Sequence, residues 1–137
     1  MGTVRSFETD IRVPGYQEVD TRLTAISDVV IYTTIGDEPF GLCPVEAMAC
    51  GVPAVITRSG GLVESIIDGE TGFIIEKDEE KVPLQLAQKI HTIFSDPDLA
   101  KRLGKAGRKR AVEFFDKKRM AKDFIELSKQ LITRGKG

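Results

Sequence analysis

Apolar residues along the chain occur in short continuous runs that alternate with segments of helical spacing. The runs at residues 29–33 and 53–57 are typical of strands buried on both faces of a sheet. A further strand is expected at residues 73–75, directly after a turn at residues 68–72. Strands that alternate with helices favour parallel βαβ units. The pattern therefore predicts an α/β domain, Rossmann-like, in which helices cover both faces of a parallel sheet.

The best-marked helix of this unit is expected at residues 41–50. Pro44 stands in its first turn, where a missing N–H costs nothing, and Gly51 follows its last residue. Two shorter helices and one more strand complete the predicted unit, at residues 20–27, 61–67 and 10–13 respectively.

Three amphipathic helices are predicted to end the chain, at residues 80–94, 98–115 and 117–133. The first carries an apolar face made of Leu86, Ile90, Ile93 and Phe94. The last carries an apolar stripe made of Met120, Phe124, Leu127 and Leu131. Such a stripe needs a partner surface. We therefore expect a dimer or larger homo-oligomer, formed by exchange of the C-terminal helix.

Composition narrows the functional classes. The 137 residues fit one domain, and 20 Lys and Arg against 21 Asp and Glu give a net charge of −1. This balance provides no field that would attract nucleic acid or an anionic membrane. No apolar run approaches the roughly 20 residues of a transmembrane helix. Cys43 and Cys50 would lie two helical turns apart, too far to bridge. A reducing cytoplasm is the expected location.

Candidate chemistry lies in the two loops that follow the buried strands. Ligands of parallel α/β sheets bind outside the carboxyl ends of the strands, where loops lead into helices. Here these loops are residues 34–42 and 58–61. Each contains glycine and ends where a helix begins, so each can present free N–H groups and a positive helix dipole to a phosphate. A nucleoside diphosphate would suit both loops.

Two carboxylates stand in the first loop and the helix after it. Glu38 precedes the helix and Glu46 lies in its first turns, so the pair can reach two parts of one extended ligand. Carboxylates accept hydrogen bonds from vicinal hydroxyls, as sugar recognition requires. The alternative is that they serve only the helix, by capping it or by complementing its dipole. No metal is predicted, because His and carboxylates do not cluster at ligand spacing, and a catalytic role for His91 is not expected.

A longer string resembles a known family. Residues 38–62 (EPFGLCPVEAMACGVPAVITRSGGL), followed by residues 68–73 (DGETGF), are similar to the C-terminal domain of group 1 glycosyltransferases, glycosyltransferase family 4. The resemblance extends from about residue 11 to about residue 131. It implies the donor-binding half of a GT-B fold and makes the whole chain one nucleotide-sugar-binding domain. The stretch at residues 41–58 looks slightly closer to the sucrose-phosphate-synthase-like subgroup than to the mannosyltransferases of lipid glycosylation.

The resemblance also implies roles for single residues. Glu38 would be the catalytic glutamate that contacts hydroxyls of the transferred sugar, and Glu46 would bind the ribose. The donor would also lie against a segment that includes Pro39 and the backbone amides of Phe40, Gly41 and Leu42, and against Gly60 and Gly61. The implied reaction moves a sugar from a nucleoside-diphosphate sugar, such as a UDP- or GDP-sugar, to an acceptor hydroxyl with retention. No cofactor is implied.

The sequence departs from the family pattern at its beginning. A basic pair that stabilises the leaving diphosphate should precede residue 10, yet Arg5 is the one basic residue there. The first βα unit or units and the N-terminal acceptor domain are also expected to be absent. We therefore expect the chain to be inactive alone. Two alternatives stay open: a non-catalytic module that binds nucleotide sugars or a partner, and one subunit of a split glycosyltransferase.

Overall fold

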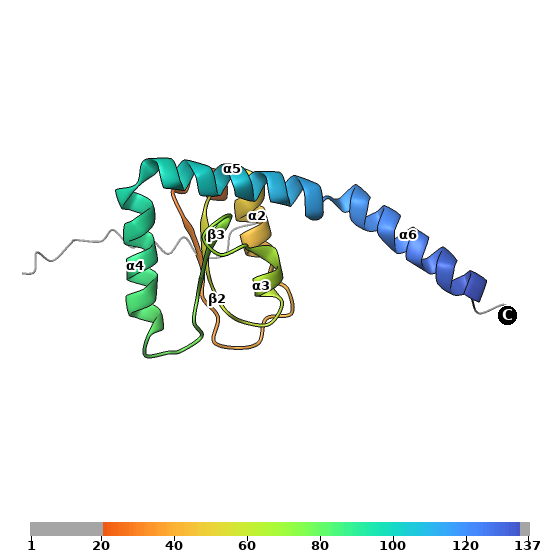
Figure 1. The fold of residues 1–137 in the computed structure, drawn as a ribbon, viewed down its shortest axis with the longest axis horizontal. Coiled ribbons are helices and arrows are strands. Elements are labelled where there is room, and N and C mark those ends of the chain that lie inside the picture. The colour runs from red at the N-terminus through yellow and green to blue at the C-terminus, as the bar shows by residue number, and fades with distance from the viewer. Residues whose placement is uncertain (1–20, 135–137) are drawn as a thin grey trace, which may run out of the picture.

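The computed structural model describes residues 21–134 (Figure 1). Its sheet has three parallel strands in the order β1-β2-β3, formed by β1 (Val30–Tyr32), β2 (Ala54–Thr57) and β3 (Gly72–Ile75). Val30 pairs with Ala54, and Ala54 pairs with Gly72. The strand expected at residues 10–13 lies outside the described residues.

Two apolar clusters show that helices cover both faces of the sheet. On one face, Ala54 and Ile56 of β2 pack with Ala47 of α2 (Leu42–Cys50) and Leu62 of α3 (Leu62–Ser65). On the other face, Val55, Phe73 and Ile75 pack with Ile93 of α4 (Val82–Ser95) and Leu103 of α5 (Pro97–Phe114). Successive strand residues alternate between the clusters, as the pleat requires. The predicted three-layer α/β architecture is confirmed.

The ends of α2 follow from its sequence. Gly41 precedes the helix with φ of 74°, and Gly51 ends it in the left-handed conformation, with its N–H directed to the carbonyls of Ala47 and Met48. Pro44 is buried in the first turn. A short helix, α1 (Thr21–Ala25), packs beside α2. The boundaries predicted for α2 are confirmed to within one residue.

Helix α5 crosses the edge of the sheet opposite the loop of residues 33–41, as the upper and lower edges of Figure 1 show. Asp96 caps it, because its Oδ1 accepts a hydrogen bond from the N–H of Leu99 at 2.9 Å. Gly104 allows close packing on α2, since a Cβ there would lie 2.1 Å from the carbonyl oxygen of Gly51. Helix α5 therefore fixes the carboxyl end of α2.

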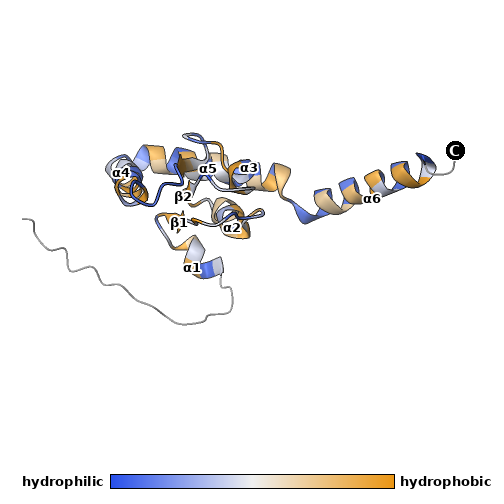
Figure 2. Cartoon of the chain, turned by 90° about the horizontal axis from the view of Figure 1, so that it is seen from below, coloured by the Kyte–Doolittle hydropathy of each residue, from blue (hydrophilic) through white to orange (hydrophobic). Residues whose placement is uncertain are grey.

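Helix α6 (Lys117–Arg134) projects from the rest of the protein and buries none of its residues (Figures 1 and 2). Its predicted stripe is present and exposed, with Met120 at 67%, Phe124 at 71%, Leu127 at 55% and Leu131 at 59% relative exposure. No helix within residues 21–134 is long and apolar enough to span a membrane.

Two burial predictions were wrong. Strand β1 is not buried on both faces, because Ile31 is 42% exposed. The helices that cover that face, α4 and α5, pack on β2 and β3 instead. Phe94 does not face the core either: it is 57% exposed, whereas its neighbour Ile93 is buried. The stripe of α4 that meets the sheet runs through Leu86 and Ile93, which leaves Phe94 beside it.

Candidate functional site

Two loops meet at the carboxyl edge of the sheet. The site loop (residues 33–41) joins β1 to α2, and the glycine loop (residues 58–61) joins β2 to α3. Because β1 and β2 are parallel neighbours, their carboxyl ends lie side by side. Both loops end at a helix start, as the sequence predicted. Helix α3 is only one turn long, so α2 provides the stronger helix dipole.

Hydrogen bonds from the end of β2 hold the first part of the site loop. The buried hydroxyl of Thr57 accepts from the N–H of Thr34 at 3.0 Å and donates to the carbonyl of Thr34 at 2.9 Å. The hydroxyl of Ser59 donates to the carbonyl of Gly36 at 2.5 Å. These bonds continue the pairing of β1 with β2 beyond the strands. Sequence reasoning missed Thr57 and Ser59, although hydroxyl side chains at the end of a buried strand were a visible signal.

The glycine pair holds the middle of the site loop. Gly61 donates its N–H to the carbonyl of Glu38 at 2.9 Å. A Cβ on Gly60 would lie 2.1 Å from that same oxygen, and a Cβ on Gly61 would lie 2.0 Å from the carbonyl oxygen of Pro39. Both distances are far shorter than any van der Waals contact, so glycine is required at both positions. The close approach that the sequence suggested for a ligand is in part an approach of one loop to the other.

Glu38 is fixed at its side chain as well as its main chain. The hydroxyl of Tyr32, the last residue of β1, donates a hydrogen bond to Oε2 of Glu38 at 3.1 Å. Chiefly this bond, and then burial and the charge of Glu38, raise the pKa of the Tyr32 phenol above its ordinary value. Sequence reasoning missed Tyr32. Its side chain meets a residue six positions later only because the site loop turns back toward the sheet.

The remaining predicted residues lie along the same segment. Phe40 packs its ring against Phe115 at the end of α5, with 5.8 Å between ring centroids. Gly41 precedes α2, and Leu42 begins it with 66% of its surface exposed. Gly41, the N-cap residue of α2, has no side chain that could cap the helix. The first turn of this helix therefore keeps its dipole available to an anionic group.

Glu46 lies in the second turn of α2, and its carboxylate makes no hydrogen bond or ion pair within residues 21–134. Cys43 lies three residues before Glu46 on the same helix, and burial, then the charge of Glu46, raise the pKa of the Cys43 thiol. Cys43 in turn acts electrostatically on Tyr32, the partner of Glu38. Glu38 precedes α2 and Glu46 lies in its second turn, so both carboxylates belong to the start of one helix, and among the described residues only Glu38 has a partner.

Basic side chains flank this edge of the sheet. Arg58 follows β2 and bonds Glu76 at 3.0 Å, and Lys77 follows β3 and bonds Asp37 of the site loop at 2.9 Å. The hydrogen bond from Lys77, and then its charge, lower the pKa of Asp37. Sequence reasoning assigned no role to Lys77, because 40 residues separate it from Asp37.

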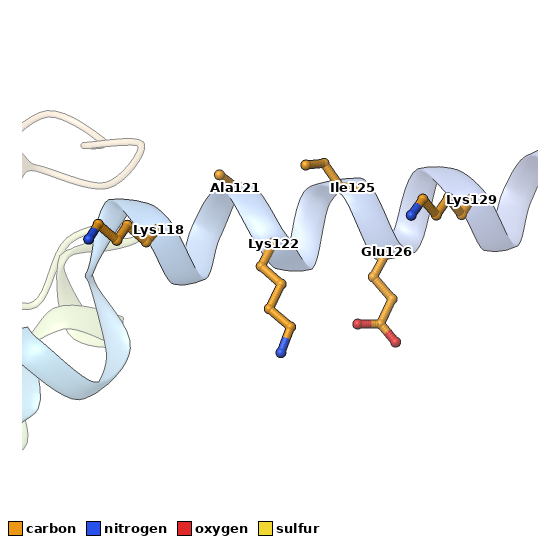
Figure 3. Close-up of a pocket in the computed structure, with 6 residues that line it drawn as sticks. All are labelled: Lys118, Ala121, Lys122, Ile125, Glu126 and Lys129. Carbon is orange, nitrogen blue, oxygen red and sulfur yellow. The ribbon is translucent and has the colours of Figure 1, made fainter.

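Other features of the described chain are weaker candidates. An open hollow of about 650 Å³ runs along α6, lined by Lys118, Ala121, Lys122, Ile125, Glu126 and Lys129 (Figure 3). All six residues come from one helix, so no second element encloses a ligand there. His91 is exposed and contacts Ser95 on its own helix. Residues 21–134 contain no group of three or more His, Cys, Asp or Glu side chains that could hold a metal ion.

Both loops lie within a part of the chain that matches a known protein family. The family described as glycosyl transferases group 1 matches residues 5–110, which is most of the chain. The chain belongs to this family. The match includes both loops, α2 and α3, and it confirms the resemblance inferred from residues 38–73.

Matches to individual proteins support the family assignment. The chain is 34% identical over 97 residues to alpha-maltose-1-phosphate synthase of Mycolicibacterium smegmatis, an overlap of 69% of this chain and 25% of that enzyme. It is 34% identical over 106 residues to spore coat protein SA of Bacillus subtilis, covering 77% of this chain and 28% of the relative. The chain thus spans about a quarter of the length of these relatives.

Solved structures share the fold. HepE of Anabaena in complex with UDP-glucose superposes with a TM-score of 0.73 at 30% identity, over 80% of this chain and 29% of HepE. Sucrose-phosphate synthase of Thermosynechococcus elongatus superposes with a TM-score of 0.69 at 34% identity, over 82% of this chain and 27% of the synthase. The described unit therefore has the fold of one part of these larger proteins.

Proposed function

We propose that this chain is the donor-binding part of a glycosyltransferase. The reaction would transfer a sugar from a nucleoside-diphosphate sugar to an acceptor hydroxyl, with the retention that the family resemblance implies. Support comes from the family match and from the likeness to HepE, which was solved with UDP-glucose. The observation that carries the proposal is the meeting of the site loop, the glycine loop and the uncapped start of α2 at one sheet edge.

The two glutamates suit two parts of the donor. Glu38 is held by Tyr32 and by the glycine loop, so its carboxylate has a defined direction for contact with a sugar. Glu46, one turn into α2, has no hydrogen-bond partner among residues 21–134, and its carboxylate is suited to the paired hydroxyls of a ribose. The diphosphate would then lie toward the N-terminus of α2, where backbone N–H groups and the helix dipole favour negative charge.

Calorimetry with two ligands tests this division. UDP carries the ribose and the diphosphate, whereas UDP-glucose carries the sugar as well. Glu46→Ala should weaken both ligands by about 1.5–3 kcal/mol, the scale of a hydrogen bond to a charged group. Glu38→Ala should weaken UDP-glucose alone. Glu70→Ala is a matched control, because Glu70 is an exposed glutamate in the turn before β3, at the opposite edge of the sheet.

Equal losses of both ligands in Glu38→Ala would contradict the assignment of Glu38, and unchanged binding of UDP in Glu46→Ala would contradict that of Glu46. The same titrations with GDP and a GDP-sugar identify the base. A second candidate is a binding module without catalysis. Addition of a purified N-terminal half should restore donor hydrolysis if the chain belongs to a split enzyme, and should restore none if it is a module.

A further inference from the structure

Tyr32 connects the core of the protein to the candidate site. Its ring packs against the apolar cluster between the sheet and α2, where Ala47 and Ile56 are fully buried. Its hydroxyl reaches Oε2 of Glu38 at 3.1 Å. The core therefore sets the position of the ring, and the ring sets the position of the hydroxyl. Within residues 21–134 the Glu38 carboxylate has no other hydrogen-bond partner and no ion pair.

The main chain of Glu38 is held independently of Tyr32. Its carbonyl accepts the N–H of Gly61 at 2.9 Å, and Gly60 packs directly against the same peptide group. A glutamate side chain anchored only at its backbone still samples several rotamers, and immobilising it on binding costs about 0.5–1.5 kcal/mol. A bond to one carboxylate oxygen removes that freedom before a ligand arrives. The second oxygen, Oε1, stays available as an acceptor.

Resting on the proposed function, we infer that Tyr32 is a positioning residue, which holds Oε2 of Glu38 so that Oε1 accepts a hydrogen bond from a hydroxyl of the donor sugar. The hydroxyl of Tyr32 acts through Glu38 and does not itself contact the sugar. Its effect should therefore be confined to ligands that carry the sugar, and it should vanish when Glu38 is removed.

Titration of the phenol tests the bond without any ligand. The chain has two tyrosines, Tyr16 and Tyr32, and no tryptophan. In a Tyr16→Phe background, the alkaline absorbance change of the folded chain reports Tyr32 alone. The groups that act on Tyr32 are Glu38 and Cys43, both of which raise its pKa. Glu38→Gln should lower the midpoint toward the ordinary value of about 10. A midpoint that Glu38→Gln leaves unchanged would overturn the inference.

Binding measurements then test the consequence. Tyr32→Phe removes the hydroxyl and keeps the ring, so the packing is preserved. It should weaken UDP-glucose by about fivefold, the scale of immobilising one side chain, and should leave UDP unchanged. In a Glu38→Ala background, Tyr32→Phe should have no further effect on UDP-glucose. Ser95→Ala is the control, since it removes an exposed hydroxyl at the end of α4, outside both loops.

The outcomes separate this inference from the function on which it rests. If the unsubstituted chain bound no nucleotide sugar, the proposed function would fall and this inference with it. If the unsubstituted chain bound UDP-glucose and Tyr32→Phe bound it equally well, only the inference would be overturned. Equal weakening of UDP and UDP-glucose, or additive losses with Glu38→Ala, would show a structural role and also overturn it.

Discussion

The site loop and α6 are opposite extremes of how firmly this protein holds its parts. The site loop has little regular structure, yet Thr57, Ser59 and Gly61 bond its backbone and Tyr32 bonds its glutamate. Helix α6 is a regular helix of 18 residues, yet it buries none of them. Regular secondary structure is therefore a poor guide to which region is fixed. Contacts with the core decide it.

Helix α5 sharpens the contrast, because it has the same length as α6 and a similar amphipathic pattern. It buries Leu103, Gly104, Gly107 and Ala111. Its two glycines let it approach α2 closely: a Cβ on Gly104 would meet the backbone of Gly51, and one on Gly107 would meet Met48. The apolar face of α6 has large side chains and no described partner. We infer that α5 belongs to this domain, whereas α6 is suited to another surface.

The largest expected effect on stability comes from disrupting the contact between the glycine loop and the site loop. Gly61→Ala places a Cβ 2.0 Å from the carbonyl oxygen of Pro39, so the two loops must separate. We expect a loss of stability of about 3 kcal/mol, the upper end of overpacking effects, together with loss of nucleotide binding. Chemical denaturation followed by circular dichroism measures the first, and calorimetry the second.

Two other glycines provide the controls. Gly69 has φ of 74° but open space around it, so Gly69→Ala should cost about 1 kcal/mol for the left-handed backbone alone. Gly36 lies in the site loop, and a Cβ there would meet only ordinary contacts, so Gly36→Ala should change stability by less than about 0.5 kcal/mol. If Gly61→Ala were as mild as Gly36→Ala, the two loops would not depend on each other.

Substitutions in the apolar stripe of α6 are expected to change stability less. Their main effect should be on the assembly state. We propose that its exposed stripe makes the chain a dimer or larger assembly at roughly 100 μM, within the range where exposed apolar surfaces associate. Phe124 is 71% exposed in the single chain, so Phe124→Asp removes no contact within the domain and should give a monomer by light scattering. Its unfolding midpoint should no longer depend on protein concentration, whereas that of the unsubstituted assembly should. Lys122→Asp, on the polar face, is the control. A clean monomer of the unsubstituted chain would contradict the proposal.

The smallest effect concerns the ion pair that joins Asp37 of the site loop to Lys77, the second residue after β3. Lys77 lowers the pKa of Asp37 below its unfolded value, so the pair stabilises the folded state above about pH 4. That stabilisation is lost as the pH falls through the lowered pKa. The effect is small, since Asp37 is 91% exposed and salt screens the pair.

Thermal melts of Asp37→Asn and of the unsubstituted chain should therefore differ slightly at pH 7 and converge in acid. A Lys77→Gln variant should show the same difference, and the double variant should show no additional one. A difference that persisted in acid, or that high salt left unchanged, would point to a cause other than this pair.

Local signals made some elements predictable from the sequence. Pro44 and Gly51 marked α2 because their backbone restrictions act within a few residues, and the φ of 75° at Gly51 is what the sequence required. The residues that resemble the family, 38–62, likewise located both loops. Burial was harder to predict for Ile31. An apolar run indicates that a strand is suited to a covered position, but it does not indicate whether a helix lies over that strand.

Contacts between distant segments could not be read in the same way. The bonds of Thr57 to Thr34 and of Lys77 to Asp37 join residues 23 and 40 positions apart. They depend on the register of parallel strands and on the path of the site loop. The sequence therefore located Glu38 and Glu46 but did not show that Tyr32 holds Glu38, nor that Glu46 has no partner in the described part of the chain.

We propose that the donor site is formed by the two loops and the start of α2. Amide proton–nitrogen correlation spectra recorded during titration with UDP-glucose test it most directly. The amides that shift should cluster in residues 36–46 and 58–62, while those of α6 stay in place. Shifts confined to α6, or no saturable shifts at all, would contradict this proposal.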